Sequence, residues 1–154
     1  MISFDLLVQA GDWGDRPDDE AIASLLAALE GETGLSGEHE LSLVLSDDAH
    51  VRVLNRDWRD KDRPTNVLSF PAEDRDPDIA PALPMLGDVV LAEETVRREA
   101  REQDKGFHDH ALHLIAHGVL HLLGHDHMDE AEAERMEDLE VKVLGRVGIG
   151  DPYT

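Results

Sequence analysis

The sequence of 154 residues contains no cysteine, an absence that excludes disulfides, thiolate metal sites and cysteine nucleophiles together. It also contains no apolar run that approaches the ~20 residues of a membrane-spanning helix. The N-terminal segment lacks both the basic start and the long apolar core of a secretory signal. These three absences together predict a cytoplasmic protein that makes no contact with a membrane.

Basic residues are scarce, because 14 lysines and arginines stand against 35 aspartates and glutamates and give a formal net charge of -21. Taken as a whole, such a charge opposes binding to a polyanion such as RNA. The basic residues are nevertheless clustered, and one twelve-residue stretch contains Arg52, Arg56, Arg59, Lys61 and Arg63. A smaller cluster consists of Arg97, Arg98 and Arg101. Charge alone leaves two interpretations open, a positive binding face on an acidic protein or ordinary solvated helix faces.

Hydrophobic residues make up 41% of the chain, which is typical of a globular protein, and we find no internal repeat or low-complexity tail. Alternating or short apolar runs predict four strands, in ISFDLLVQ, HELSLVLS, NVLSFP and MLGDVVLA. The stretch 72–84, AEDRDPDIAPALP, is rich in proline and aspartate. It is therefore predicted to be a loop rather than a linker between domains.

Apolar residues at helical spacing predict five helices. Three are expected at 17–30, 92–104 and 107–123. Another follows the sequence SDD, which supplies an N-cap, and has a predicted core face of Val51, Leu54, Asn55 and Trp58. The last, about 129–147, has a plausible cap in Asp129 and an apolar face of Met136, Leu139, Val143 and Val147. This order predicts one α+β domain over residues 1–154, with about five helices covering a mixed sheet of about four strands.

Histidines are concentrated in HLIAHGVLHLLGHDH, residues 113–127, where five of fifteen residues are histidine. His113, His117, His121 and His125 follow one another at intervals of four, so they form a row on one face of a helix. The helical rise puts His113 and His121 about 12 Å apart, whereas imidazole nitrogens bind zinc at ~2.0–2.1 Å. One ion can therefore take one adjacent pair from the row and must complete its shell elsewhere.

Gly124 indicates which pair is used, because glycine suits the left-handed position just past the end of a helix. Beyond such a turn, His127 can approach the face that carries His117 and His121. The resulting set has the spacing H-x-x-x-H-x-x-G-x-x-H. Three neutral imidazoles leave a fourth position for water, which is typical of a catalytic zinc site. We therefore expect one zinc ion on His117, His121 and His127, held on a central helix.

The remaining histidines are expected to have lesser roles. His113 is predicted to be a core histidine or to support a ligand, and His125 to be an exposed turn residue. His108 and His110, at the start of the same helix, are predicted to be solvated. Asp126 has two equal interpretations, as a partner that orients a ligand imidazole or as a turn residue.

The ligand spacing resembles that of the metzincin peptidases, whose motif is H-E-x-x-H-x-x-G-x-x-H. The glutamate that acts as general base in those enzymes falls on Gly118 here. A glycine side chain has no proton to move, so a peptidase would need a base from elsewhere. A metzincin-like zinc metallopeptidase is therefore the second hypothesis.

A fuller resemblance is to the YbeY family of bacterial endoribonucleases and ribosomal RNA maturation factors. It rests on HGVLHLLGHDH together with LNRDWRDKDRPTNVLSFP, residues 54–71, and LGDVVLA, in the family's order, and it covers roughly residues 40–145. Asn66 stands where an aspartate is frequent in the family, and His125 where a tyrosine is frequent. Neither position is a metal ligand in the family, so the assignment of the metal site is unaffected.

This resemblance implies a zinc-dependent, single-strand-specific endoribonuclease that acts in 3′-end maturation of small-subunit ribosomal RNA and in ribosome quality control. It implies a single zinc on His117, His121 and His127, with Arg59 as a functional residue beside the metal. The implied partners are ribosomal RNA and ribosome or small-subunit assembly proteins, and DNA is not expected. A non-catalytic, metal-binding ribosome assembly factor is the third hypothesis.

Two chemical routes stay open for such a site. Zinc would lower the pKa of its water from ~15.7 towards ~7, or it would polarise a phosphoryl oxygen while the 2′-hydroxyl of the RNA attacks. Both routes build negative charge on the phosphoryl oxygens, which the permanently charged fork of Arg59 would stabilise. Lys61 and Arg63 are weaker candidates that would contact the RNA backbone. Without the family resemblance, a surface ion pair with Asp57, Asp60 or Asp62 is the simpler explanation of Arg59.

Overall fold

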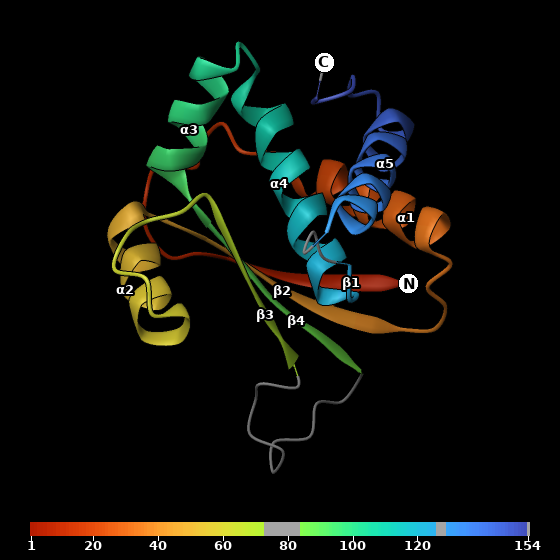
Figure 1. Cartoon of the computed structure of the whole chain (residues 1–154), viewed down its shortest axis with the longest axis horizontal. Coiled ribbons are helices and arrows are strands. Elements are labelled where there is room, and N and C mark those ends of the chain that lie inside the picture. The colour runs from red at the N-terminus through yellow and green to blue at the C-terminus, as the bar shows by residue number, and fades with distance from the viewer. Residues whose placement is uncertain (73–83, 126–128, 154) are drawn as a thin grey trace.

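The computed structural model describes residues 1–72, 84–125 and 129–153. In these residues four strands form one mixed sheet in the order β1-β2-β4-β3 (Figure 1). The strands are β1 (Ile2–Val8), β2 (His39–Ser46), β3 (Val67–Pro71) and β4 (Met85–Ala92). Strand β2 runs parallel to both β1 and β4, whereas β3 pairs antiparallel with β4 and forms one edge of the sheet.

Five helices cover this sheet in the described part of the chain: α1 (Asp19–Thr33), α2 (Asp48–Arg59), α3 (Glu93–Glu102), α4 (Phe107–Leu122) and α5 (Glu130–Arg146). Successive residues of a strand point to opposite faces, and β4 shows this clearly. Val89 and Leu91 pack with α1, α4 and α5, whereas Val90 and Ala92 pack with Val51 of α2. Helix α2 therefore covers one face of the sheet, and α1, α4 and α5 cover the other (Figure 1).

Helix α4 is central to the larger core because one of its sides is wholly apolar. Leu112, Ile115, Val119 and Leu120 recur at helical spacing and are each at most 2% exposed. The helix ends at Leu122, and Gly124 just past its end takes a left-handed φ of 94°, as predicted. The N–H of His125 then donates to the carbonyl of Leu120 at 3.0 Å, which satisfies a carbonyl at the helix end.

These features confirm the predicted single α+β domain, with its four strands and five helices. One prediction on α2 is wrong, because Trp58 does not belong to the core face and is 66% exposed. Helix α2 buries Val51 and Asn55, and Trp58 belongs to its last turn. There the Trp58 ring makes a T-shaped contact with Phe70 of β3, with 6.3 Å between ring centroids.

Membrane contact was not expected from the sequence. In the part of the chain that the structure describes, no helix combines the length and the apolarity that crossing a membrane requires.

Candidate functional site

His117 and His121 lie one turn apart on α4 and turn their rings toward each other. Their Nε2 atoms are 3.1 Å apart, and the ring planes are close to perpendicular, at 80°. Two nitrogen ligands of one tetrahedral zinc, each at ~2.0–2.1 Å from the ion, are separated by roughly 3.3–3.4 Å. The two predicted ligands on α4 therefore converge at the separation that a shared ion requires.

The third predicted ligand, His127, lies outside the described residues, as does Asp126. Across residues 1–72, 84–125 and 129–153, no group of three histidine, cysteine, aspartate or glutamate side chains could hold a metal ion. The described residues thus include two of the three predicted ligands, the pair on α4.

Glu140 is the residue of this site that sequence reasoning missed. It lies on α5, is completely buried, and its Oε1 is 2.5 Å from Nδ1 of His117. Its signal was present in the sequence, because Glu140 is four residues after Met136 and three before Val143, on the predicted apolar face of this helix. A carboxylate on such a face is almost never fully buried without a partner, and here the partner is a predicted metal ligand.

Glu140 is held as an anion by its neighbours. Burial by itself would raise its pKa, but hydrogen bonds from His113, His117 and Tyr153 outweigh this effect and bring the pKa to about 2. A carboxylate that is ionised at neutral pH can only accept hydrogen bonds, so Nδ1 of His117 must carry the proton. The lone pair of His117 is therefore on Nε2, the atom that faces His121.

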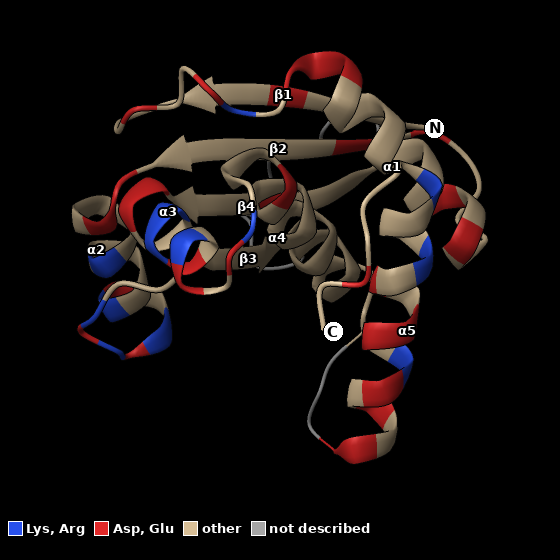
Figure 2. Ribbon diagram, turned by 90° about the horizontal axis from the view of Figure 1, so that it is seen from above, with Lys and Arg blue, Asp and Glu red and all other residues tan. Residues whose placement is uncertain are grey.

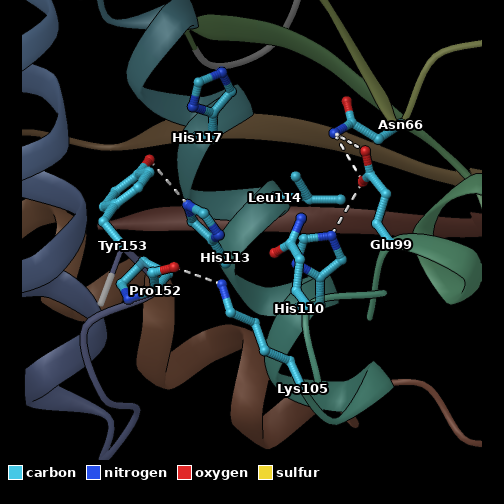
Figure 3. Close-up of a pocket in the computed structure, with 10 residues that line it drawn as sticks. Asn66, Glu99, Lys105, His110, His113, Leu114, His117, Pro152 and Tyr153 are labelled. Carbon is cyan, nitrogen blue, oxygen red and sulfur yellow. Dashed lines mark hydrogen bonds and ion pairs between the residues drawn. The ribbon is translucent and has the colours of Figure 1, made fainter. Parts of the chain in front are cut away.

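Tyr153 and His113 complete the support of Glu140. The Tyr153 hydroxyl donates to Oε2 of Glu140. Nε2 of His113 is 3.3 Å from the same hydroxyl (Figure 3). Burial, followed by the bond to Glu140, raises the pKa of Tyr153, so the phenol keeps its proton. His113 is also 3.5 Å from Oε2 of Glu140, in the supporting position predicted for it.

The prediction for His110 is wrong, whereas that for His108 is confirmed. His108 is half exposed beside Asp109. His110 is only 3% exposed, and its Nε2 is 3.1 Å from Oε1 of Glu99. Helix α3 packs across the first turns of α4 and encloses the ring, and this burial lowers the pKa of His110 against the opposing effect of Glu99.

Arg59 is the last residue of α2, and its side chain extends to the edge strand. Its Nη2 donates to the carbonyl oxygen of Ser69, and the guanidinium lies 5.4 Å from the centroid of the Phe70 ring. Within the described residues it makes no ion pair with Asp57, Asp60 or Asp62. Asp62 is instead bound to Arg52 and Asp57 to Arg56, and Asp60 is the C-cap of α2. The alternative explanation of Arg59 as a local ion pair is therefore wrong.

Ser69 links Arg59 to α4, the helix that carries His117 and His121. Its carbonyl accepts from Arg59, and its Oγ donates to the carbonyl of Gly118 at 2.9 Å. Gly118 directly follows His117 in α4. Ser69 alone therefore bridges Arg59 to α4, although Arg59 lies fifty-eight residues before His117 in the sequence.

Lys61 and Arg63 lie in the exposed loop after α2. The side-chain amide of buried Asn55 anchors this loop by donating to the carbonyl of Arg63 at 2.9 Å. Figure 2 shows that lysines and arginines gather on α2 and this loop, whereas acidic residues dominate α5. The basic cluster of the sequence therefore lies at one end of the molecule, where aspartates are interspersed with it and pair with Arg52 and Arg56.

Gly118 allows α4 to approach the sheet closely. A Cβ atom at this position would lie 2.8 Å from Cγ1 of Val89 and 3.1 Å from Oγ of Ser69. Both neighbours belong to the sheet, where they cannot move aside easily. The position that carries the metzincin glutamate thus has no room for a side chain here, which argues further against peptidase chemistry of that kind.

We expect Gly118→Ala to lower the free energy of unfolding by about 1–3 kcal/mol, because the added methyl overpacks the contact with Val89. Chemical denaturation of the variant and the parent protein measures this difference. Gly145→Ala on α5 is a matched control, since a Cβ there has no neighbour within 4 Å. That change should stabilise the helix by roughly 0.5–1 kcal/mol. Equal stability of Gly118→Ala and parent protein would contradict the close packing.

Comparison with known proteins shows which family this sequence matches. A sequence profile of the family described as "Endoribonuclease YbeY" matches residues 15–148. A protein named "Endoribonuclease YbeY" from Sinorhizobium medicae is 47% identical over 99% of this chain and 95% of its own length. Proteins with the same name are 60% identical over 74% of this chain and 67% of the relative in Agrobacterium fabrum, and 55% identical over 89% and 86% in Paramagnetospirillum magneticum.

A solved structure has a similar fold. The solution structure of TM1509 from Thermotoga maritima matches with a TM-score of 0.61 and 25% sequence identity, over 94% of this chain and 89% of that one. The arrangement of strands and helices around α4 is therefore shared with an experimentally determined protein.

Proposed function

The chain belongs to the endoribonuclease YbeY family, and we propose that it is a zinc-dependent endoribonuclease that cuts single-stranded RNA. The family predicted from the two sequence motifs is thereby confirmed, and so is the class of enzyme, a hydrolase that acts on RNA. The zinc, the single-strand specificity and the biological substrate belong to the proposal.

For the biological role, we propose 3′-end maturation of small-subunit ribosomal RNA and ribosome quality control in the cytoplasm. The substrate would then be ribosomal RNA, and ribosomal or small-subunit assembly proteins would be partners. The basic residues on α2 and its loop support an RNA substrate, since the rest of this acidic chain would repel a polyanion.

One observation carries the proposed metal: buried Glu140 bonds to Nδ1 of His117, and Nε2 of His117 meets Nε2 of His121. Histidines that bind metals commonly donate their other N–H to a carboxylate, which fixes the ring and raises its basicity. Burial of a glutamate on an apolar helix face would cost folding free energy without such a hydrogen-bond partner. The donor set therefore fits zinc, with His117, His121 and the predicted His127 as its ligands.

When bound, zinc would supply a Lewis acid beside the scissile phosphate. The chain's own residues have separate roles around it. Glu140 keeps the proton of His117 on Nδ1. Arg59 has five N–H donors, and the bond to the Ser69 carbonyl aims its fork while others remain for a phosphoryl oxygen. This charge would be most valuable in the transition state, when negative charge on the phosphoryl oxygens is greatest.

The decisive experiment is cleavage of a single-stranded RNA by purified protein, before and after removal of metal with a chelator and again after zinc is restored. Cleavage should disappear with the metal and return with it. The double variant His117→Ala/His121→Ala, purified in parallel, controls for a contaminating nuclease. RNA binding without cleavage in the zinc-loaded protein would instead favour the non-catalytic assembly factor.

The support from α5 can be tested through metal affinity. We expect Glu140→Gln to weaken zinc binding by about 10–100-fold, because a neutral amide no longer raises the basicity of His117. Tyr153→Phe, which removes only one bond to Glu140, should weaken it less. Competition with a chromophoric chelator measures both affinities. Glu137→Gln, at an exposed position of α5, is the matched control and should bind zinc like the parent. An unchanged affinity in Glu140→Gln would remove Glu140 from the metal centre.

A further inference from the structure

A cavity of about 360 Å³ opens beside His117, along the part of α4 that carries His110 and His113. Its walls also include Asn66, Glu99 and the C-terminal residues Pro152 and Tyr153 (Figure 3). This volume is within the ~300–1,000 Å³ typical of small-molecule sites. The cavity therefore has room for one planar group of a substrate that is held at His117.

A carboxylate is fixed in the wall of this cavity. The amide nitrogen of Asn66 lies 3.0 Å from Oε1 and 3.3 Å from Oε2 of Glu99, and Nε2 of His110 lies 3.1 Å from Oε1 (Figure 3). A carboxylate has about four acceptor positions, and these neighbours use mainly those of Oε1. Glu99 therefore keeps acceptor capacity, mostly on Oε2, in a side chain that its neighbours hold in place.

The remaining wall is both apolar and polar. Leu114 and Pro152 supply apolar surface, and the exposed amide of Gln103 stands near the rim. Lys105 is turned to the Pro152 carbonyl, to which its ammonium donates at 2.6 Å, so it does not neutralise Glu99 directly. A planar, partly apolar group with N–H donors suits these surroundings.

The carboxylate decides which part of an RNA could enter. It repels a phosphate and favours a group with N–H donors. Among the nucleobases, guanine presents two adjacent donors on its pairing edge, the ring N1–H and the exocyclic amine, whereas adenine, cytosine and uracil each present one. The two donors of guanine are adjacent, so both can be directed at the same carboxylate oxygen, Oε2 of Glu99, which makes guanine the best match.

We propose that this cavity is a nucleobase subsite that receives an unstacked guanine close to the scissile phosphate, with Glu99 as its specificity-determining residue. The proposal rests on the endoribonuclease function and extends it to sequence preference. It also supplies a physical reason for a preference for single strands. In a duplex the pairing edge of guanine is already occupied, whereas in a single strand the base can turn outward into a protein pocket.

Cleavage of a single-stranded RNA pool of random sequence tests this inference, with the ends of the products sequenced. The parent protein should show guanine enriched at one constant distance from the cut. Glu99→Gln should reduce that enrichment by about 10–100-fold, the discrimination typical of a pair of hydrogen bonds to one base edge. Glu102→Gln, an exposed position of the same helix, should leave the enrichment unchanged. Cleavage with no guanine preference in the parent protein would overturn the subsite and leave the nuclease function intact.

A second measurement does not depend on cleavage. Guanosine added to the zinc-loaded protein should shift the NMR signals of residues lining the cavity, such as His113 and Gln103. Inosine, which lacks the exocyclic amine, should bind about tenfold or more weakly. If guanosine shifts these signals but no RNA is cut, the proposed nuclease function fails while the subsite stands. If guanosine and inosine bind alike, or neither binds, the carboxylate does not select guanine.

Discussion

His117→Ala and His121→Ala are each expected to abolish tight zinc binding, from about one zinc per chain in the parent protein to almost none. Each variant leaves at most two imidazoles of the proposed triad, and two imidazoles alone hold zinc poorly. The 3.1 Å separation of the two Nε2 atoms makes the pair a single unit, so loss of either ring should have the same effect. His127→Ala is expected to behave in the same way. Elemental analysis of the purified variants measures the metal directly.

Two further histidines serve as controls in this series. His125→Ala should retain the metal, since His125 belongs to the turn after α4. His113→Ala should also retain it, with a cost in stability because His113 packs against Tyr153, at 5.5 Å between ring centroids. Full occupancy in His127→Ala would show that the third ligand has been assigned wrongly. Loss of zinc from His125→Ala alone would move that ligand to His125.

Arg59→Ala is expected to lower the rate of RNA cleavage by about 10²–10³ while zinc content and folding stay unchanged. A guanidinium cannot coordinate a cation, and its bond to the Ser69 carbonyl lies on the open edge of the sheet, so its loss should not disturb the core. Arg59→Lys should restore only part of the rate, because an ammonium cannot reproduce the bidentate fork. Single-turnover cleavage rates and zinc contents, measured on the same preparations, test both variants.

Lys61→Ala and Arg63→Ala separate RNA binding from chemistry. Both residues lie in the exposed loop that follows α2, where they can reach an RNA backbone. Their loss should weaken RNA binding and reduce the slope of its salt dependence by about one unit for each lost contact. For both variants, the single-turnover rate at saturating protein should stay close to that of the parent.

The Arg59 prediction has its own contradicting outcome. A parental cleavage rate in Arg59→Ala, in a preparation free of other nucleases, would exclude Arg59 from the mechanism.

Much of the fold could be predicted because its signals are local. The apolar spacing in α4, the left-handed turn at Gly124 and the Asp129 cap each depend on a few neighbouring residues. The pair His117 and His121 could be predicted for the same reason, since residues four apart on a helix lie on one face. The exposure of Trp58 could not be predicted, because it depends on how the last turn of α2 packs against β3 and not on the spacing within the helix.

The contacts that support the proposed metal ligands could not be predicted, because they join elements that are distant in the sequence. Glu140 meets His117 across the contact between α5 and α4, and Tyr153 reaches the same carboxylate from the C-terminal segment. Glu99 likewise reaches His110 from α3. A buried acidic residue on an apolar face was the only sequence signal for any of these contacts, and it indicates that a partner exists without identifying it.

The antiparallel pairing of β3 has a consequence for the solubility of the protein. Its bond pattern starts with the N–H of Ala92 donating to the carbonyl of Asn66, so the alternation leaves the carbonyl of Ser69 facing away from β4. An open strand edge of this kind is a template on which a strand from another molecule can add, and such additions lead to aggregates. The guanidinium of Arg59 covers this carbonyl and places a positive charge on the edge. Arg59, the residue proposed to act on RNA, thereby also hinders the edge-to-edge pairing of sheets from two molecules.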